Sequence, residues 1–218
     1  MSSIYYPAVD NDDPEHIIRF APDYPGIHTM YGAHLGYLEV GTPGGDKGQE
    51  NFRPLFHLTL PDEGKVEADV TWAKIWFYCS LRTGSPESSS YDLHRCSRYD
   101  WWSYYGHTTT CCEETCYQHS DATWTASGGD GTTPSVNFYG PSAIGWFSVT
   151  ITDLVKDAIT NRTRDINAII FSPKEASRGW NFYCKHYTGS GDPPNYLYRW
   201  YIEVEWAAAA GKSQVIMF

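Results

Sequence analysis

The sequence predicts an all-β fold, an antiparallel β-sandwich of the jelly-roll type with one short helix and a long loop rich in cysteine and aromatic residues. Three observations predict it. Short segments of alternating apolar and polar residues follow one another between turns, a pattern typical of sandwiches and barrels. A single short segment, after residue 151, has helical periodicity. The length of 218 residues suits one large β domain, since such folds often reach about 200 residues undivided.

The first half of the chain contains four predicted strands, over residues 17–20, 52–60, 71–79 and 91–96. The clearest is 71–79, because its side chains alternate strictly. One face of this strand is expected in the core, and consists of Ala73, Ile75, Phe77 and Cys79. The other face is an aromatic ladder of Trp72, Trp76 and Tyr78, interrupted by Lys74. We favour burial of the ladder under another layer or loop, and the alternative is an exposed binding stripe.

The second half is predicted to contain a strand over 148–151, a short helix, and strands over 166–172, 180–186 and 196–206. Thr152 is the predicted N-cap of the helix, because its hydroxyl can accept a bond from a first-turn amide. The last strand is predicted to bury one face, made of Tyr198, Trp200, Ile202, Val204 and Trp206. Residues 1–51 are interpreted as strands and turns of the same domain and 52–206 as its core. Residues 207–218 form an apolar tail that is expected to dock on the domain or on a partner.

Charge and hydropathy exclude two classes of partner. The net charge is −10, and no run of Lys or Arg stands out, so we expect neither nucleic-acid binding nor an anionic membrane surface as partner. No apolar segment reaches a membrane-spanning length. The first residues lack a basic stretch followed by an apolar run, so no secretion signal is expected. We therefore expect a virion-surface or extracellular location reached by another route.

The region from 99 to 133 is predicted to be one long irregular loop, and loops of this length inside a domain are usually functional. Its aromatic residues could contact a glycan or a protein partner, because Trp and Tyr combine a flat apolar face with a polar tip. These candidates are Trp101, Trp102, Tyr104, Tyr105 and Trp124. The alternative is that they cover the edge of the sandwich.

The chain has six cysteines, and their spacing leaves three alternatives: disulfides, buried thiols or a metal site. Thiolate and imidazole are good zinc ligands, but the chain lacks paired C-x2-C knuckles. The disulfide or metal candidates are Cys79, Cys96, Cys111, Cys112, Cys116 and Cys184.

An acidic turn near the N-terminus is the second metal candidate. Asp10, Asp12 and Asp13 place oxygen atoms close together, as a structural calcium ion requires. The alternative, which we favour, is a solvated turn, because Asp and Asn often occupy turns. No other cofactor is expected.

Several segments in series resemble the DNRLRE-type family of carbohydrate-binding-module-like jelly rolls. The similarity runs from about Phe52 to Trp206. It comprises RPLFHL near residue 53, AKIWF near 73, WTASGGD near 124, GWFSVTITDLV near 145, INAIIF near 166 and YRWYIEV near 198. The long Cys- and His-rich insertion and both ends depart from the family pattern. The resemblance implies a module that binds polysaccharide or serves as a structural or adhesive unit, including on phage particles, without catalytic activity.

We find no motif for a nucleophile, a metalloprotease or a phosphate loop, so no enzyme is expected. The sequence therefore predicts a non-catalytic structural or decoration protein of a larger assembly, such as a phage or virus particle. Its partners would be other subunits, contacted through the C-terminal tail. The alternative function is a glycan-binding adhesion module with polysaccharide as its partner.

Overall fold

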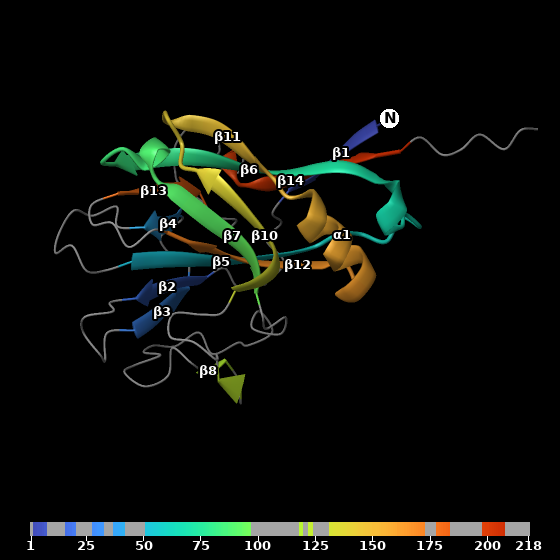
Figure 1. Ribbon diagram of the computed structural model, residues 1–218, viewed down its shortest axis with the longest axis horizontal. Helices are drawn as coiled ribbons and strands as arrows, with labels where there is room; N and C mark the ends of the chain where they lie inside the picture. The colour runs from blue at the N-terminus through green and yellow to red at the C-terminus, as the bar shows by residue number, and fades with distance from the viewer. Residues whose placement is uncertain are drawn as a thin grey trace, which may run out of the picture.

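The computed structural model describes residues 2–7, 16–20, 28–32, 37–41, 51–96, 118–119, 122–123, 131–172, 178–183 and 198–207. Within these ranges the chain is an all-β fold with one α-helix, α1 (Thr152–Asn161), so the predicted fold class is confirmed. A single antiparallel sheet of 12 strands curls around the core (Figure 1).

The bounds of the strands of this sheet are β1 Ser2–Pro7, β2 His16–Phe20, β3 His28–Gly32, β4 Tyr37–Gly41, β5 Asn51–Thr59, β6 Val70–Thr83, β7 Ser90–Cys96, β10 Gly131–Tyr139, β11 Gly145–Thr150, β12 Asp165–Phe171, β13 Gly179–Tyr183 and β14 Tyr201–Trp206. Two short 3₁₀ turns connect strands of this sheet: Glu67–Asp69 lies between β5 and β6, and Pro86–Ser88 lies between β6 and β7. Two short strands, β8 (Gln118–His119) and β9 (Ala122–Thr123), pair with each other separately.

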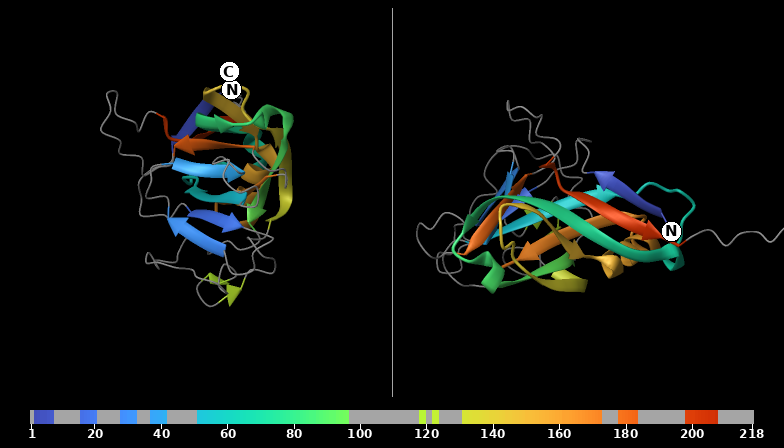
Figure 2. Two further views of the ribbon diagram at one scale, coloured as in Figure 1. Left: turned by 90° about the vertical axis from the view of Figure 1, so that its left-hand side faces the viewer. Right: turned by 90° about the horizontal axis from the view of Figure 1, so that it is seen from above.

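The order of strands across the sheet is β1-β14-β6-β13-β4-β5-β12-β7-β10, and β2 pairs with β5 while β3 pairs with β2. β6 is the longest strand, with 14 residues, and it joins two parts of the sheet. One edge of β6 pairs with β14 over its first half and with β13 over its second half. Its other edge pairs with β11. Figure 2 shows β1, β14 and β6 running side by side.

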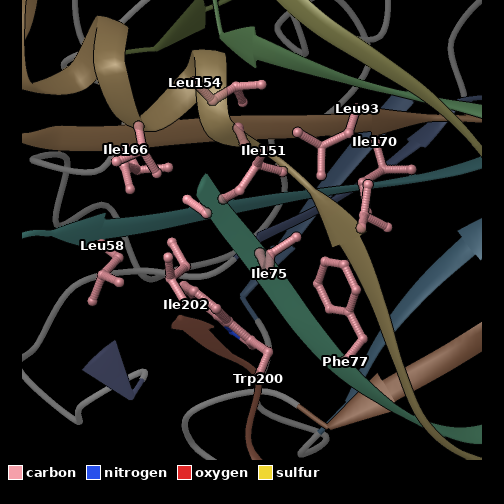
Figure 3. Packing of buried hydrophobic residues seen from close by; sticks show 14 of the residues in the cluster. Leu58, Ile75, Phe77, Leu93, Ile151, Leu154, Ile166, Ile170, Trp200 and Ile202 are labelled. Atoms are coloured by element: carbon pink, nitrogen blue, oxygen red, sulfur yellow. The ribbon is translucent and has the colours of Figure 1, made fainter. Parts of the chain in front are cut away.

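The core lies inside the curled sheet and is filled by large apolar side chains from strands that are distant in sequence (Figure 3). Ala73, Ile75, Phe77 and Cys79 of β6 are fully buried, as their alternation predicts. The ring of Phe77 contacts the rings of Trp180 and Phe182, at centroid distances of 5.6 and 4.6 Å. Contacts of this kind add to the apolar area that the rings bury.

Helix α1 closes one end of the sheet and is fastened by polar contacts as well as by its apolar side. Leu154, Val155 and Ala158 are buried against the core. Arg95 on β7 donates from Nη1 to both carboxylate oxygens of Asp157, at 2.8 Å each. This charge-assisted contact ties the helix to the strand beneath it.

Two boundary predictions are wrong. The N-cap of α1 is Ile151 and not Thr152, because the Thr152 hydroxyl accepts a 3.0 Å bond from the backbone amide of Ala73 on β6. The last strand begins at Tyr201 and not at 196. Trp200 is nonetheless fully buried, together with Ile202, Val204 and Trp206, as the predicted apolar face requires. The prediction is wrong for Tyr198, which is only partly buried and packs on Tyr78, a residue that points away from the core. β1, β3, β4, β8, β9 and β10 were not predicted as strands, and β8, β9 and the start of β10 fall in the region 99–133 that was predicted to be one irregular loop.

Replacing Phe77 with Ala tests the location of the core. We expect the free energy of unfolding to fall by about 3–5 kcal/mol, since the substitution removes a buried ring and leaves a cavity. Urea unfolding followed by circular dichroism measures this loss. Thr71→Ala is the matched control, because Thr71 is exposed on the same strand and should change stability by less than about 0.5 kcal/mol. Equal losses in the two variants would contradict the assignment.

Candidate functional site

The candidate site is the outer surface of four neighbouring strands, β1, β14, β6 and β11. Side chains alternate along a strand, so the residues between the core positions of these strands point outward together. We call this surface the aromatic face. It consists of Ser3 and Tyr5 on β1, Tyr201, Glu203 and Glu205 on β14, Trp72, Lys74, Trp76 and Tyr78 on β6, and Trp146, Ser148 and Thr150 on β11.

Tyr201 is at the centre of a group of rings on this face. Strand register places it opposite Trp76, and the two rings stack at a centroid distance of 6.0 Å and an angle of 15°. Tyr5 and Trp146 pack against Tyr201 edge to face, at 5.8 and 5.3 Å. Each ring is therefore held by its neighbours as well as by its strand.

The series of rings continues from Trp146 through Tyr78. Trp146 and Tyr78 are register partners, and their rings pack edge to face at 5.4 Å. Tyr78 also stacks with Tyr183 of β13 at 5.9 Å and contacts Tyr198 at 4.4 Å. Aromatic side chains from five strands thus form one connected surface.

The carboxylate of Glu203 contacts the aromatic rings beside it, those of Trp76 and Tyr5. Glu203 is only 8% exposed, and its Oε2 accepts a 2.9 Å hydrogen bond from Nε1 of Trp76. The negative charge of Glu203 and its hydrogen bond with the phenol raise the pKa of Tyr5. Burial and the charge of Glu203 likewise raise the pKa of Tyr201. Both phenols therefore stay protonated, and can donate hydrogen bonds, throughout the neutral pH range.

The one cation of the aromatic face is engaged by its rings. Nζ of Lys74 lies 5.1 Å from the ring centroid of Trp72 and 6.0 Å from that of Trp76. Cations at such distances are attracted by the electron-rich faces of the rings. Lys74 thereby covers part of the two indoles and fixes their orientation.

The aromatic face remains accessible to solvent. Tyr5 is 59% exposed and Trp146 is 39% exposed, while Trp72, Trp76, Tyr78 and Tyr201 are partly exposed. Apart from Pro7, which register places opposite Tyr201, each position on this side of the four strands, as far as Tyr78 on β6, holds Trp, Tyr, Ser, Thr, Lys or Glu. The surface therefore combines flat rings with hydroxyl and charged groups.

The aromatic ladder at Trp72, Trp76 and Tyr78 does point away from the core, as its alternation predicts. All three side chains are only partly exposed, which lies between the burial under another layer that we favoured and the alternative of an exposed stripe. Sequence reasoning also missed Tyr5 and Trp146 as members of the site. Each lies in a segment with alternating side chains, but only strand pairing brings these segments beside β6.

Most of the other predicted site residues lie outside the described residues and stay predictions. These are the loop aromatics Trp101, Trp102, Tyr104, Tyr105 and Trp124, the acidic turn at Asp10, Asp12 and Asp13, and Cys111, Cys112, Cys116 and Cys184. The tail beyond Ala207 also lies outside them.

Cys79 and Cys96 are the two predicted cysteine candidates that the structure describes. Both are buried, and they lie on different strands, β6 and β7. The Cys79 thiol donates to the backbone oxygen of Leu81 at 3.3 Å. Burial raises the pKa of this thiol to about 11, which outweighs the opposing effects of Arg82 and of the Leu81 bond. A thiol with a raised pKa is a poor nucleophile and metal ligand at neutral pH.

One group of residues, His57, Thr59 and Asp165, has the composition of a catalytic triad. Its geometry differs from one, because Nε2 of His57 is 3.3 Å from both the Thr59 hydroxyl and Asp165 Oδ1. The hydroxyl donates to the carboxylate itself, at 2.5 Å. A triad needs the hydroxyl and the carboxylate on opposite ring nitrogens. This group therefore acts as a polar link between β5 and β12.

The same contacts determine the acidity of Asp165. Burial acts to raise the pKa of its carboxyl, but the hydrogen bonds from His57 and Thr59 outweigh this effect and lower it. Asp165 is therefore ionised at neutral pH and is not poised to act as a general acid.

Neither a metal cluster nor a membrane-crossing helix occurs in the described ranges. No group of three or more His, Cys, Asp or Glu side chains in them is arranged to hold a metal ion. No helix in them has the length and apolar character needed to cross a bilayer. The chain matches no family model and no curated protein.

Replacing Glu203 with Ala tests the internal support of the aromatic face. We expect stability to fall by about 1.5–3 kcal/mol, because the bonds from Trp76 and Tyr5 to a charged acceptor are lost. Tryptophan emission should also shift as Trp76 loses its partner. Urea unfolding and fluorescence measure the two effects. Glu205→Ala is the matched control on the same strand and face, and equal effects in both variants would show that Glu203 has no special role.

The buried thiol predicts how stability changes in alkali. The Cys79 pKa is higher in the folded chain than its ordinary value of 9.0, so the folded state holds this proton more tightly. The resulting stabilisation is complete below pH 9.0 and is lost as pH rises through about 11. Urea unfolding across this window should therefore give a shallower decline for Cys79→Ala than for the unmodified chain. Parallel declines would contradict the burial of the thiol.

Proposed function

We propose that this chain is a non-catalytic glycan-binding module and that the aromatic face is its binding surface. The observation that carries the proposal is the connected set of Trp and Tyr rings, partly exposed on one sheet surface with Ser, Thr, Lys and Glu residues among them. Apolar C–H surfaces of sugars stack on aromatic rings, and nearby polar groups hydrogen-bond their hydroxyls. Both kinds of contact are available on this face.

Preorganisation supports the proposal. A sugar gains little from each contact, so a binding surface that must first become ordered would lose much of that gain. On the aromatic face the rings are already fixed, because Tyr201 contacts three of them and Glu203 accepts a hydrogen bond from Trp76. Little side-chain freedom is left to lose on binding.

The composition of the face favours a hydroxyl-rich ligand over another protein. Buried centres of protein interfaces are enriched in Trp, Tyr, Phe and Met, and they are depleted of Ser and of charged residues such as Glu and Lys. The aromatic face shares the Trp and Tyr of such interfaces but has no Phe or Met, and it places Ser148, Thr150 and Glu205 among its rings. These side chains offer hydrogen bonds at positions that a protein interface would leave apolar.

Two further points support a binding module. The resemblance of residues 52–206 to DNRLRE-type modules implies polysaccharide binding, and we include that family assignment in the proposal. The one triad-like group in the described ranges has the wrong geometry for nucleophilic catalysis, and His57 is buried.

The decisive experiment compares Trp146→Ala with Tyr139→Ala in pull-down assays on insoluble polysaccharides and in titration calorimetry with soluble ones. Loss of a contacting aromatic ring costs on the order of 1–2 kcal/mol, so Trp146→Ala should weaken binding about tenfold or more. Tyr139 is 68% exposed on β10, outside the aromatic face, so it is the matched aromatic control. Its replacement should leave binding unchanged.

The same two variants test the competing function, a structural or decoration protein of a larger assembly. In that case the aromatic face would be covered by another subunit. Sedimentation would then detect self-association or assembly that Trp146→Ala abolishes, and no polysaccharide would be retained. That pair of results would overturn the glycan proposal.

A further inference from the structure

We infer that the aromatic face selects an extended, uncharged, linear polysaccharide of equatorially linked pyranoses, bound over several sugar units between Tyr5 and Trp146. This inference rests on the proposed glycan-binding function and specifies its ligand. Three features of the face carry it: the spacing of its exposed rings, their placement on one sheet surface, and its charges.

The exposed rings of Tyr5 and Trp146 lie within the length of about two sugars of an extended chain. Tyr5 and Trp146 are the two most exposed rings of the face, and both contact Tyr201, at centroid distances of 5.8 and 5.3 Å. The distance between the Tyr5 and Trp146 rings is therefore at most the sum of these two centroid distances. Each of the two distances is close to the length of one pyranose in an extended chain. Alternate sugars of an equatorially linked chain turn the same face in one direction, so sugars two units apart can stack on Tyr5 and Trp146.

The rings follow a path across the strands of one sheet surface. Register places Tyr5 opposite Glu203 on β14, and Tyr201 lies two residues before Glu203 on that strand. On β6 the partner of Tyr201 is Trp76, and Tyr78 lies two residues after Trp76. Trp146 of β11 lies opposite Tyr78. The path therefore advances in one diagonal direction from β1 to β11. We infer that a ribbon-like glycan follows this diagonal path, and the comparison with α-linked malto-oligosaccharides below tests that choice.

The charges of the face disfavour anionic glycans. At the positions that define the face, the charged side chains are Glu203, Glu205 and Lys74. Nζ of Lys74 is held over Trp72 and Trp76, so this cation is already engaged. The whole chain also carries a net charge of −10, which repels a polyanion at long range. An uncharged glycan needs no cation for binding and is not repelled by the net negative charge.

The experiment is titration calorimetry of the whole chain with β-1,4-linked oligosaccharides of glucose, mannose, xylose and N-acetylglucosamine, from the monosaccharide to the hexasaccharide. For the sugar that binds, affinity should rise about tenfold or more between disaccharide and tetrasaccharide and then level off. Malto-oligosaccharides and oligogalacturonates of equal length should bind at least about tenfold more weakly.

Variants of Tyr5 test the extended site directly. Tyr5→Ala should weaken hexasaccharide binding about tenfold and leave disaccharide binding unchanged, because it removes one end of the path. Tyr5→Phe retains the ring and should bind the hexasaccharide nearly as well as the unmodified chain. Tyr5 is exposed on the edge strand of the sheet, and circular dichroism checks that both variants fold.

The outcomes separate the inference from the proposed function. Binding that depends on Trp146 but is equally strong for the monosaccharide, for malto-oligosaccharides or for oligogalacturonates overturns the inference and retains the function. An unchanged hexasaccharide affinity in Tyr5→Ala also overturns the inference. If none of the probes binds, or if binding is indifferent to Trp146→Ala, both fail.

Discussion

Antiparallel pairing of β6 along both of its edges is the constraint on which the rest of the structure depends. With β14 and β13 on one edge and β11 on the other, this strand cannot rotate or slip, since a shift of one residue would exchange its two faces. Ile75 and Phe77 are thereby committed to the core, and Trp76 and Tyr78 to the aromatic face. The hydrophobic core and the candidate site are two sides of the same strand.

Burial of the core therefore determines the geometry of the site. Phe77 is locked against Trp180 and Phe182, and apolar burial is the main stabilising contribution in folding. Adjacent residues of β6 share one backbone, so packing of Ile75 and Phe77 in the core also fixes the backbone positions of Trp76 and Tyr78 on the opposite face. A platform built in this way keeps its rings in place without a ligand, which is the property that weak sugar contacts require.

Glu203 departs from the alternation of buried apolar and exposed polar residues, because it is a charged side chain on the outward face that is nearly buried. A nearly buried carboxylate on a strand is costly unless it is hydrogen-bonded. Here the cost is offset by the bond from Trp76 and by the contact with Tyr5, which come from the strands on either side of β14. The charge links three strands across the aromatic face. Such a residue looks like an ordinary exposed strand position in the sequence, because its partners come from strands that are distant along the chain.

The sequence alone determined the fold class, the alternation of β6, the apolar side of α1 and the buried face that ends at Trp206. These features depend on local periodicity, which can be read within a short segment. It did not determine the start of the last strand at Tyr201, the role of Thr152, or the strands near the N-terminus, because these depend on partners elsewhere in the chain. The aromatic face was decided by tertiary structure. Trp76 alternates outward in its own segment, but Tyr5, Trp146 and Tyr201 join it only through strand register, a property that no single segment contains.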